Sequence, residues 1–170
     1  MKIAICGSHG VGKTTISKII SEEFGLTTLP DIVVDAHKMW LEINENTPME
    51  TQLRLAAKQF ENEFTNKDFV ADKCIFDYHV YAKALNMDED IVVITKKLAL
   101  KSHNYDHIFY IKPEFDLVDD GLRSLDPKFQ SDVHDVYENF LKENQINYYT
   151  ISWSIEDRKN QILDFINNSK

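Results

Sequence analysis

Short apolar runs alternate with amphipathic segments along this chain. Five apolar runs predict strands, at residues 2–6, 29–34, 69–76, 107–111 and 148–152. The segments between and after them carry apolar residues at helical spacing and predict helices, at about residues 16–24, 36–43, 49–65, 78–86, 89–102, 133–143 and 154–166. Short apolar strands that alternate with helices indicate a parallel sheet covered on both faces. We therefore expect a three-layer α/β fold.

Length and composition suit one domain. The chain has 170 residues, of which 43% are hydrophobic, and this is enough for one sizeable core. We expect a single domain over residues 1–170. Neither a leader pattern nor an apolar run of ~18 residues is present, which predicts a cytoplasmic protein without a membrane segment. Cys6 and Cys74 lie far apart in apolar runs and predict buried, reduced thiols.

The charge balance limits the classes of partner. The formal net charge is -9, and no cluster of Lys and Arg interrupts it. Phosphate backbones are bound by clustered Lys and Arg, so the composition argues against duplex nucleic acid as the main partner. A small anionic ligand remains compatible, because one local site can be positive. The sequence leaves the oligomeric state open, and a homodimer is one option.

A phosphate-binding motif follows the first predicted strand. Residues 7–14 read Gly-Ser-His-Gly-Val-Gly-Lys-Thr, which matches GxxxxGK[ST] and opens the first predicted helix. Glycines let backbone N–H groups curl around a triphosphate, and the helix dipole points its positive end there. We expect ATP here, with Lys13 at the β and γ phosphates and the Thr14 hydroxyl on Mg²⁺. The expected nucleotide-binding residues are Gly7, Ser8, His9, Gly10, Val11, Gly12, Lys13, Thr14 and Thr15.

A second Mg²⁺ ligand is expected at the end of a neighbouring strand. The apolar run at residues 69–76 is followed by Asp77, so Asp77 is the predicted partner of Thr14. Capping of the next helix is the alternative role for Asp77, and the two roles can coexist. The six histidines form no pattern such as HExxH, so no metal other than Mg²⁺ is indicated.

With these residues, the sequence resembles the P-loop nucleoside and nucleotide kinases. It is most similar to the small AAA-type ATP-binding proteins related to nicotinamide riboside kinase domains and to thymidylate kinase. The resemblance covers most of the chain, and the phosphate loop is its specific part. On this basis we expect a P-loop NTPase fold whose five-stranded parallel sheet has the order 2-3-1-4-5, with ATP at the carboxyl ends of the strands.

The resemblance also implies residues for the phosphoryl acceptor. In the family the second strand ends in an acid, with an arginine three positions later, and Asp35 and Lys38 stand in that place. Asp35 is expected to orient the acceptor hydroxyl and Lys38 to hold its phosphate or ribose. A solvated acid and base at a helix start is the alternative for this pair. The family's third strand ends in Asp-Arg, matched here by Asp77 and Tyr78, which leaves Tyr78 to stack on a base.

Two arginines complete the implied site. The family's mobile lid follows the fourth strand, and residues 114–131 resemble it. Arg123 is then the lid arginine that neutralises charge on the γ-phosphate, with a plain surface position as its alternative. Residues 154–158 resemble the family's closing turn near the adenine, which places Arg158 against the base.

These residues together predict an ATP-dependent kinase for a nucleoside, a nucleoside monophosphate or a similar small metabolite. Transfer would be in line, with Lys13 and Arg123 stabilising the phosphoryl group and Asp35 orienting the acceptor. The identity of the acceptor, and whether it already carries a phosphate, stay open.

Three other functions would share the phosphate loop. A GTPase normally needs Asn-Lys-x-Asp, and the nearest segment, residues 66–69, has Phe69 at the deciding position. A regulatory or degenerate protein would bind ATP without transferring it, and the altered acceptor positions keep this alternative open. A polynucleotide kinase is the third alternative, and the negative net charge argues against it. ADP release that depends on an acceptor would separate the predicted kinase from the two alternatives that remain open.

Overall fold

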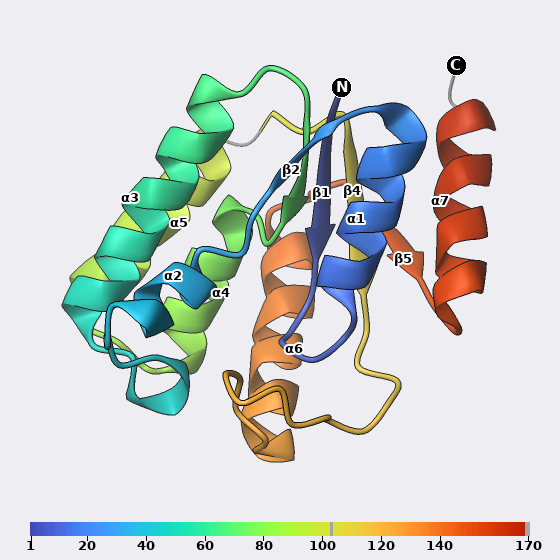
Figure 1. Cartoon of the computed structure of the whole chain (residues 1–170). Coiled ribbons are helices and arrows are strands. Elements are labelled where there is room, and N and C mark those ends of the chain that lie inside the picture. Colours follow the sequence, from blue (N-terminus) through green and yellow to red (C-terminus); the bar gives the residue numbers. More distant parts are fainter. Residues whose placement is uncertain (103, 169–170) are drawn as a thin grey trace.

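The structure is a computed structural model that describes residues 1–102 and 104–168. Within these residues, five parallel strands form one sheet in the order β2-β3-β1-β4-β5 (Figure 1). The strands are β1 (Lys2–Cys6), β2 (Thr27–Leu29), β3 (Phe69–Asp72), β4 (His107–Ile111) and β5 (Tyr149–Ile151). β1 is central, and Ala4 lies opposite Ala71 of β3 and Ile108 of β4. The predicted fold class and strand order are confirmed.

Helices cover both faces of the sheet (Figure 1). One face carries α1 (Lys13–Phe24) and α7 (Ile155–Asn168). The other carries α3 (Met49–Thr65), α4 (Ile75–Ala84), α5 (Glu89–Ser102) and α6 (Pro127–Glu143). The short helix α2 (Val33–Lys38) and the 3-10 helix η1 (Asn44–Asn46) connect β2 to α3. In the described part of the chain, no helix combines the length and the apolar composition that a bilayer crossing requires.

Both faces of β1 are buried, as a parallel sheet requires. Successive side chains of a strand point to opposite faces. Ile3 and Ile5 therefore pack with the residues of α1 and α7, whereas Ala4 and Cys6 pack with those of α4 and α6. Cys6 and Cys74 are free and buried, as predicted. This double burial fixes β1 rigidly under the loop that follows it.

The second strand ends earlier than the apolar pattern predicts. The run at residues 29–34 predicts a strand there, whereas β2 spans Thr27–Leu29. Pro30 has no N–H for a sheet hydrogen bond. Asp31 then accepts a hydrogen bond from the Val33 N–H at 3.0 Å and starts α2. The helix predicted at residues 36–43 is accordingly Val33–Lys38.

The third strand is also shorter than predicted. The run at residues 69–76 predicts a strand that reaches Asp77, whereas β3 ends at Asp72. Lys73 follows with a φ angle of 80°, in the left-handed region that interrupts a strand. Cys74 then caps α4, because its N–H donates to Asp77 Oδ2 at 2.8 Å. The apolar residues 74–76 therefore belong to a buried helix start.

Candidate active site

The phosphate loop joins β1 to α1 at the carboxyl end of the sheet. Gly7 has a φ angle of 141°, and a Cβ there would lie 2.4 Å from the backbone oxygen of Ile111. A side chain at this position would force the loop to move. Residues 10–15 of the loop and the start of α1 line a cavity of about 230 Å³, which Val118, Asp120 and Arg123 complete. We refer to it as the phosphate cavity.

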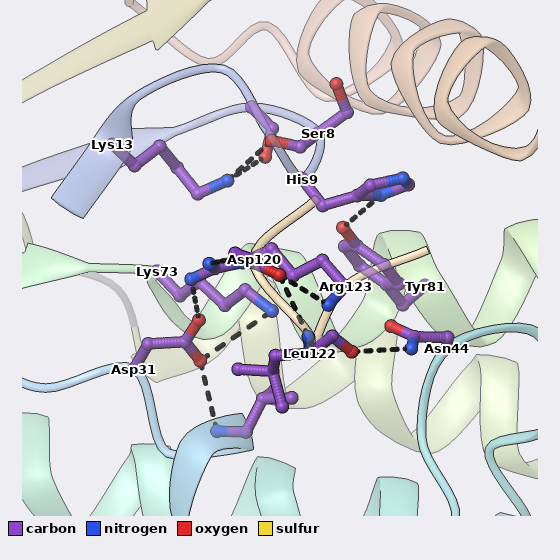
Figure 2. Close-up of polar contacts among 12 residues, drawn as sticks. Ser8, His9, Lys13, Asp31, Asn44, Lys73, Tyr81, Asp120, Leu122 and Arg123 are labelled. Atoms are coloured by element: carbon purple, nitrogen blue, oxygen red, sulfur yellow. Dashed lines mark hydrogen bonds and ion pairs between the residues drawn. The ribbon is translucent and has the colours of Figure 1, made fainter. Parts of the chain in front are cut away.

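Lys13 is folded against its own loop. Its Nζ donates to the backbone oxygens of Gly7 at 2.8 Å and of Ser8 at 2.6 Å (Figure 2). Burial lowers the pKa of Lys13, and the charge of Asp77 opposes that effect. The ammonium group is therefore buried beside the phosphate cavity with hydrogen bonds that a phosphate oxygen could replace.

Arg158 supports the loop from within the protein. Its Nη1 donates to the Val11 oxygen at 2.7 Å and its Nη2 to Glu114 Oε2 at 2.9 Å. Its side chain is 2% exposed, and its guanidinium carbon lies 5.5 Å from the centroid of the Phe115 ring. The guanidinium is therefore enclosed and braces the loop, and the contact of Arg158 with an adenine stays a prediction.

Asp72, the last residue of β3, is the acid beside Thr14. Burial raises the pKa of Asp72, and a hydrogen bond from the Thr14 side chain counteracts that rise. Among the described residues, Asp72 Oδ1 has no hydrogen-bond partner and is buried. A hydroxyl and a carboxylate with a free oxygen are the hard ligands that Mg²⁺ prefers, and Mg²⁺ usually keeps several waters as well. The residues at this position therefore fit Mg²⁺.

Asp77, the predicted metal partner, does not end a strand. It lies in the first turn of α4, where Oδ2 accepts the Cys74 N–H, and its side chain is buried. Burial raises the pKa of Asp77, and the charge of Lys13 is the strongest effect in the opposite direction. The capping role is thus the one observed, and Asp72 takes the position at the strand end.

A second set of ion pairs lies beside the phosphate loop, centred on the buried Asp31 (Figure 2). Asp31 Oδ2 is 3.0 Å from Arg123 Nη2, and Oδ1 is 3.7 Å from Lys73 Nζ. Burial alone would raise the pKa of Asp31, but Lys73, the Val33 N–H and Arg123 lower it below its ordinary value. Arg123 also pairs with Asp120 of its own loop.

These ion pairs border a second, smaller cavity of about 30 Å³, which we call the acceptor cavity. Its walls combine aromatic and apolar residues with uncharged polar ones: His9, Tyr78, Tyr81, Val33, Ile43, Leu55, Asn44, Thr47 and Gln52. Its charged members are Lys73, Asp77 and Arg123. Tyr78 therefore lies at a cavity, as expected of a residue that contacts a base. Arg123 lines this cavity and the phosphate cavity alike.

Asp35 and Lys38 line neither the phosphate cavity nor the acceptor cavity, but a separate groove of about 670 Å³ between α2 and α3. They lie on the exposed side of α2, with side chains 68% and 70% exposed, and are 3.4 Å from each other. Their exposure fits the alternative of a solvated acid and base, and the acceptor role of this pair stays a prediction. The early end of β2 makes Asp31, and not Asp35, the acid that follows the strand.

Comparison with known proteins places the chain in a family. The profile of the AAA domain family matches residues 2–158. The chain belongs to the AAA domain family. No curated protein sequence matches it significantly.

Solved structures with the same fold as this AAA domain include three kinds of kinase-related protein. Deoxyadenosine kinase from M. mycoides, with products dCMP and a flexible dCDP bound, is 17% identical, covers 100% of both chains and has a TM-score of 0.73. NadR in complex with NR is 17% identical with a TM-score of 0.76, and the match covers 98% of this chain but 50% of NadR. Thymidylate kinase from Ehrlichia chaffeensis is 17% identical, with 98% of each chain covered and a TM-score of 0.68. The AAA domain thus has the fold of P-loop nucleoside and nucleotide kinases.

Sequence reasoning missed Asp31, Asp72 and Lys73 in this AAA domain. Asp72 and Lys73 resemble the family's Asp-Arg pattern five residues before the predicted pair, with Lys in place of Arg. The dipeptide Asp-Lys inside an apolar run was the available signal, since buried charges are rare without a partner. For Asp31 the signal was the preceding Pro30, which ends the strand.

His9 of the AAA domain makes several contacts, although it occupies a variable position of the loop motif. Its ring stacks on Phe129 at 5.4 Å, and its Nδ1 is 3.2 Å from the Tyr81 hydroxyl. Its backbone oxygen accepts a hydrogen bond from Gln130 Nε2 at 2.8 Å. Burial lowers the pKa of His9 to about 4, with Lys13 as the next cause. A neutral imidazole therefore joins the phosphate loop to the acceptor cavity.

Proposed function

We propose that this chain is an ATP-dependent kinase that transfers the γ-phosphoryl group of ATP to a hydroxyl group of a nucleoside or nucleoside monophosphate. The observation that carries the proposal is the position of Arg123, which lines the phosphate cavity and the acceptor cavity together. A group that moves from one cavity to the other passes this guanidinium. Such a cation stabilises the charge that spreads over the transferring phosphoryl group.

The donor side would be formed by residues 7–15. The backbone N–H groups of the loop and the N-terminus of α1 would bind the phosphates. Lys13 would exchange its two carbonyl partners for β and γ phosphate oxygens. Thr14 and Asp72 would hold Mg²⁺, which when bound neutralises charge on the phosphates.

On the acceptor side, Asp31 takes the role that the sequence suggested for Asp35. Its lowered pKa keeps the carboxylate ionised at neutral pH, so it can accept a hydrogen bond from the acceptor hydroxyl. The hydroxyl would displace Arg123 from Asp31, and Arg123 would then face the phosphoryl group. Direct in-line transfer needs no covalent enzyme intermediate.

The comparisons support this proposal through the shared fold and the kinase activities of the similar proteins. The similar structures include a deoxyadenosine kinase with the products dCMP and dCDP, and a NadR in complex with NAD and AMP-PNP. Because similar structures bind nucleotides, phosphoryl transfer between two ligands is the simplest chemistry for two adjoining cavities on this fold.

The test is ADP release from ATP and Mg²⁺ across a panel of nucleosides, nucleoside monophosphates and short oligonucleotides, with products identified by mass spectrometry. We expect one class of acceptor to raise turnover and to appear as a phosphorylated product. Lys13→Ala should lower kcat/KM by about 10³-fold, because the lysine acts on the moving charge. Lys18→Ala, on the exposed side of α1, is the matched control and should retain activity. If ATP binds and no acceptor raises turnover, the protein is a regulatory or degenerate ATP-binding protein.

A further inference from the structure

We propose that the acceptor is an uncharged nucleoside, held by its heterocycle in the acceptor cavity, and not a nucleoside monophosphate. This inference rests on the proposed function and names the substrate class of the same site. Three independent features of the acceptor cavity support it. They are its charge balance, its unpartnered polar atoms and its aromatic walls.

The cations of the acceptor cavity are already neutralised. Within residues 1–102 and 104–168, its two cations are Lys73 and Arg123, and both bind Asp31. Arg123 binds Asp120 as well. Even with Asp77 protonated, two cations face two carboxylates, so no positive charge is left over. Sites for phosphorylated ligands need the opposite arrangement, since a phosphate monoester brings a charge of about -1.5 to -2.

Adding a phosphate to this cavity would therefore be unfavourable. The group would lie beside Asp31 and Asp77, both of which are buried. A buried charge without a counter-charge is costly, and like charges in one site repel. A neutral acceptor avoids that cost and needs a carboxylate only for its hydroxyl group. Asp31 supplies this carboxylate.

Two buried polar atoms around the cavity lack partners in the described part of the chain. They are the Tyr78 hydroxyl and His9 Nε2. Their residues are both 3% exposed. Buried polar groups are normally hydrogen-bonded, so two such atoms at one cavity indicate a ligand with polar groups of its own. The edge of a nucleobase carries such groups, whereas a phosphate offers mainly acceptors.

The shape of the walls fits a flat ring. The rings of His9, Tyr78 and Tyr81 line the cavity together with the apolar Val33 and Leu55. Heteroaromatic ligands bind in such apolar and aromatic sites with a few polar groups that fix their orientation. Phe129 holds the rings of His9 and Tyr81 at centroid distances of 5.4 and 6.0 Å.

The cavity has to open before an acceptor enters. Its volume of about 30 Å³ is far below the roughly 300 Å³ of a small ligand site. The loop that carries Arg123 is tied to the η1 segment, because Asn44 Nδ2 donates to the Leu122 oxygen at 2.8 Å (Figure 2). Ser124 also donates to Glu45. Separation of these two segments would free Arg123 from Asp31 and admit the nucleoside.

The first experiment compares each nucleoside with its own 5′-monophosphate, at fixed ATP and Mg²⁺, and identifies the products by mass spectrometry. The panel contains the common ribonucleosides and deoxyribonucleosides and nicotinamide riboside. We expect kcat/KM for at least one nucleoside to exceed that of its monophosphate by about 100-fold, which corresponds to about 2.7 kcal/mol of unfavourable charge interaction. Preference for a monophosphate would overturn the inference and leave the kinase intact. Transfer to no acceptor would overturn the proposed kinase itself.

A second experiment tests the cavity residues. Tyr78→Phe removes one unpartnered hydroxyl and should raise the KM for the preferred nucleoside by about tenfold, with the KM for ATP little changed. Tyr148→Phe, whose ring packs against Tyr110 away from the cavity, is the matched control and should change neither value. Equal effects of Tyr78→Phe on both substrates would contradict its assignment to the acceptor.

Asp120→Asn tests the charge argument directly. The asparagine oxygen can still accept the N–H groups of Leu122 and Arg123, which Asp120 Oδ1 accepts now. One negative charge beside Arg123 is lost, so the ratio of kcat/KM for monophosphate to that for nucleoside should rise about tenfold. An unchanged ratio would show that charge does not select the acceptor.

Discussion

The phosphate cavity and the acceptor cavity adjoin each other but are built in different ways. The phosphate cavity consists mainly of one continuous segment, whose glycines and backbone N–H groups set its geometry. The acceptor cavity collects side chains from the phosphate loop, α2, the η1 segment, α3, the end of β3, α4 and the loop before α6. Its centre is the ion-pair cluster of Asp31, Lys73 and Arg123.

This difference determines what each site tolerates. A backbone site survives most side-chain changes outside its glycines and its lysine, because N–H groups bind the ligand. An ion-pair site depends on every member, because loss of one partner leaves a buried charge without compensation. Lys73, with its φ angle of 80°, adds backbone strain at the same place, as functional sites often do. The acceptor cavity is therefore the part of this fold in which specificity can change.

The largest expected effect distinguishes Asp72 from Asp77 as the ligand of Mg²⁺. Asp72→Asn should lower kcat by about 10³-fold and raise the Mg²⁺ concentration needed for half-maximal activity, because it removes a carboxylate beside Thr14. Asp77→Asn is the matched comparison and should act on acceptor binding, with its Mg²⁺ dependence near that of the parent protein. Titration of activity with Mg²⁺ at saturating ATP decides between them. If Asp77→Asn and not Asp72→Asn changed the Mg²⁺ dependence, Asp77 would be the metal ligand.

The next largest effect concerns the acid of the acceptor cavity. Asp31→Asn should lower kcat by about 100-fold, since a neutral amide cannot take the hydroxyl proton. It should also lower the free energy of unfolding, by about 3 kcal/mol, because Lys73 stays buried without a carboxylate. ATP binding, measured by calorimetry, should be nearly unchanged. Asp35→Asn, on an exposed side chain, should leave activity and stability intact. An inactive Asp35→Asn protein would place the acceptor in the groove between α2 and α3 instead.

The two cavities also differ in how far the sequence predicts them. The phosphate loop was predictable because GxxxxGK[ST] encodes a backbone path within a few consecutive residues. Fold class and strand order followed from the alternation of strands and helices together with the resemblance. The exact strand ends did not follow, since hydrophobicity continues from Phe69 through Phe76 while the backbone turns at Lys73.

Long-range pairing explains the remainder. Asp31 and Arg123 are 92 positions apart, and no periodic pattern in the sequence predicts their contact. The family's lid pattern pointed to Arg123 as a site residue, whereas no pattern pointed to its partner Asp31. Arg158 is the converse case, because the resemblance of residues 154–158 to the family's closing turn does not reveal that the guanidinium is enclosed and binds the Val11 oxygen. Burial and pairing of charges are tertiary properties that single-sequence patterns do not carry.

The smallest expected effect is a pH dependence at His9, where the two cavities meet. Burial keeps the pKa of His9 at about 4 in the folded protein, against about 6.5 in the unfolded chain. Between these values the unfolded chain binds the proton and the folded protein does not, so stability falls as pH decreases from 6.5 to 4. The charged groups that act on the imidazole are Lys13, Lys73, Arg123 and Asp120.

His9→Gln should remove this part of the pH dependence. The difference in unfolding free energy between the parent and His9→Gln proteins should shrink by on the order of 2 kcal/mol from pH 7 to pH 4, measured by urea denaturation. His37→Gln, at an exposed position of α2, is the control for the substitution itself and should leave the free energy of unfolding at pH 7 unchanged. A constant difference for His9→Gln would mean that His9 titrates alike in both states, which would require solvent to reach its ring. The acceptor cavity would then be open in the free protein, and admission of a nucleoside would not need the lid and the η1 segment to separate.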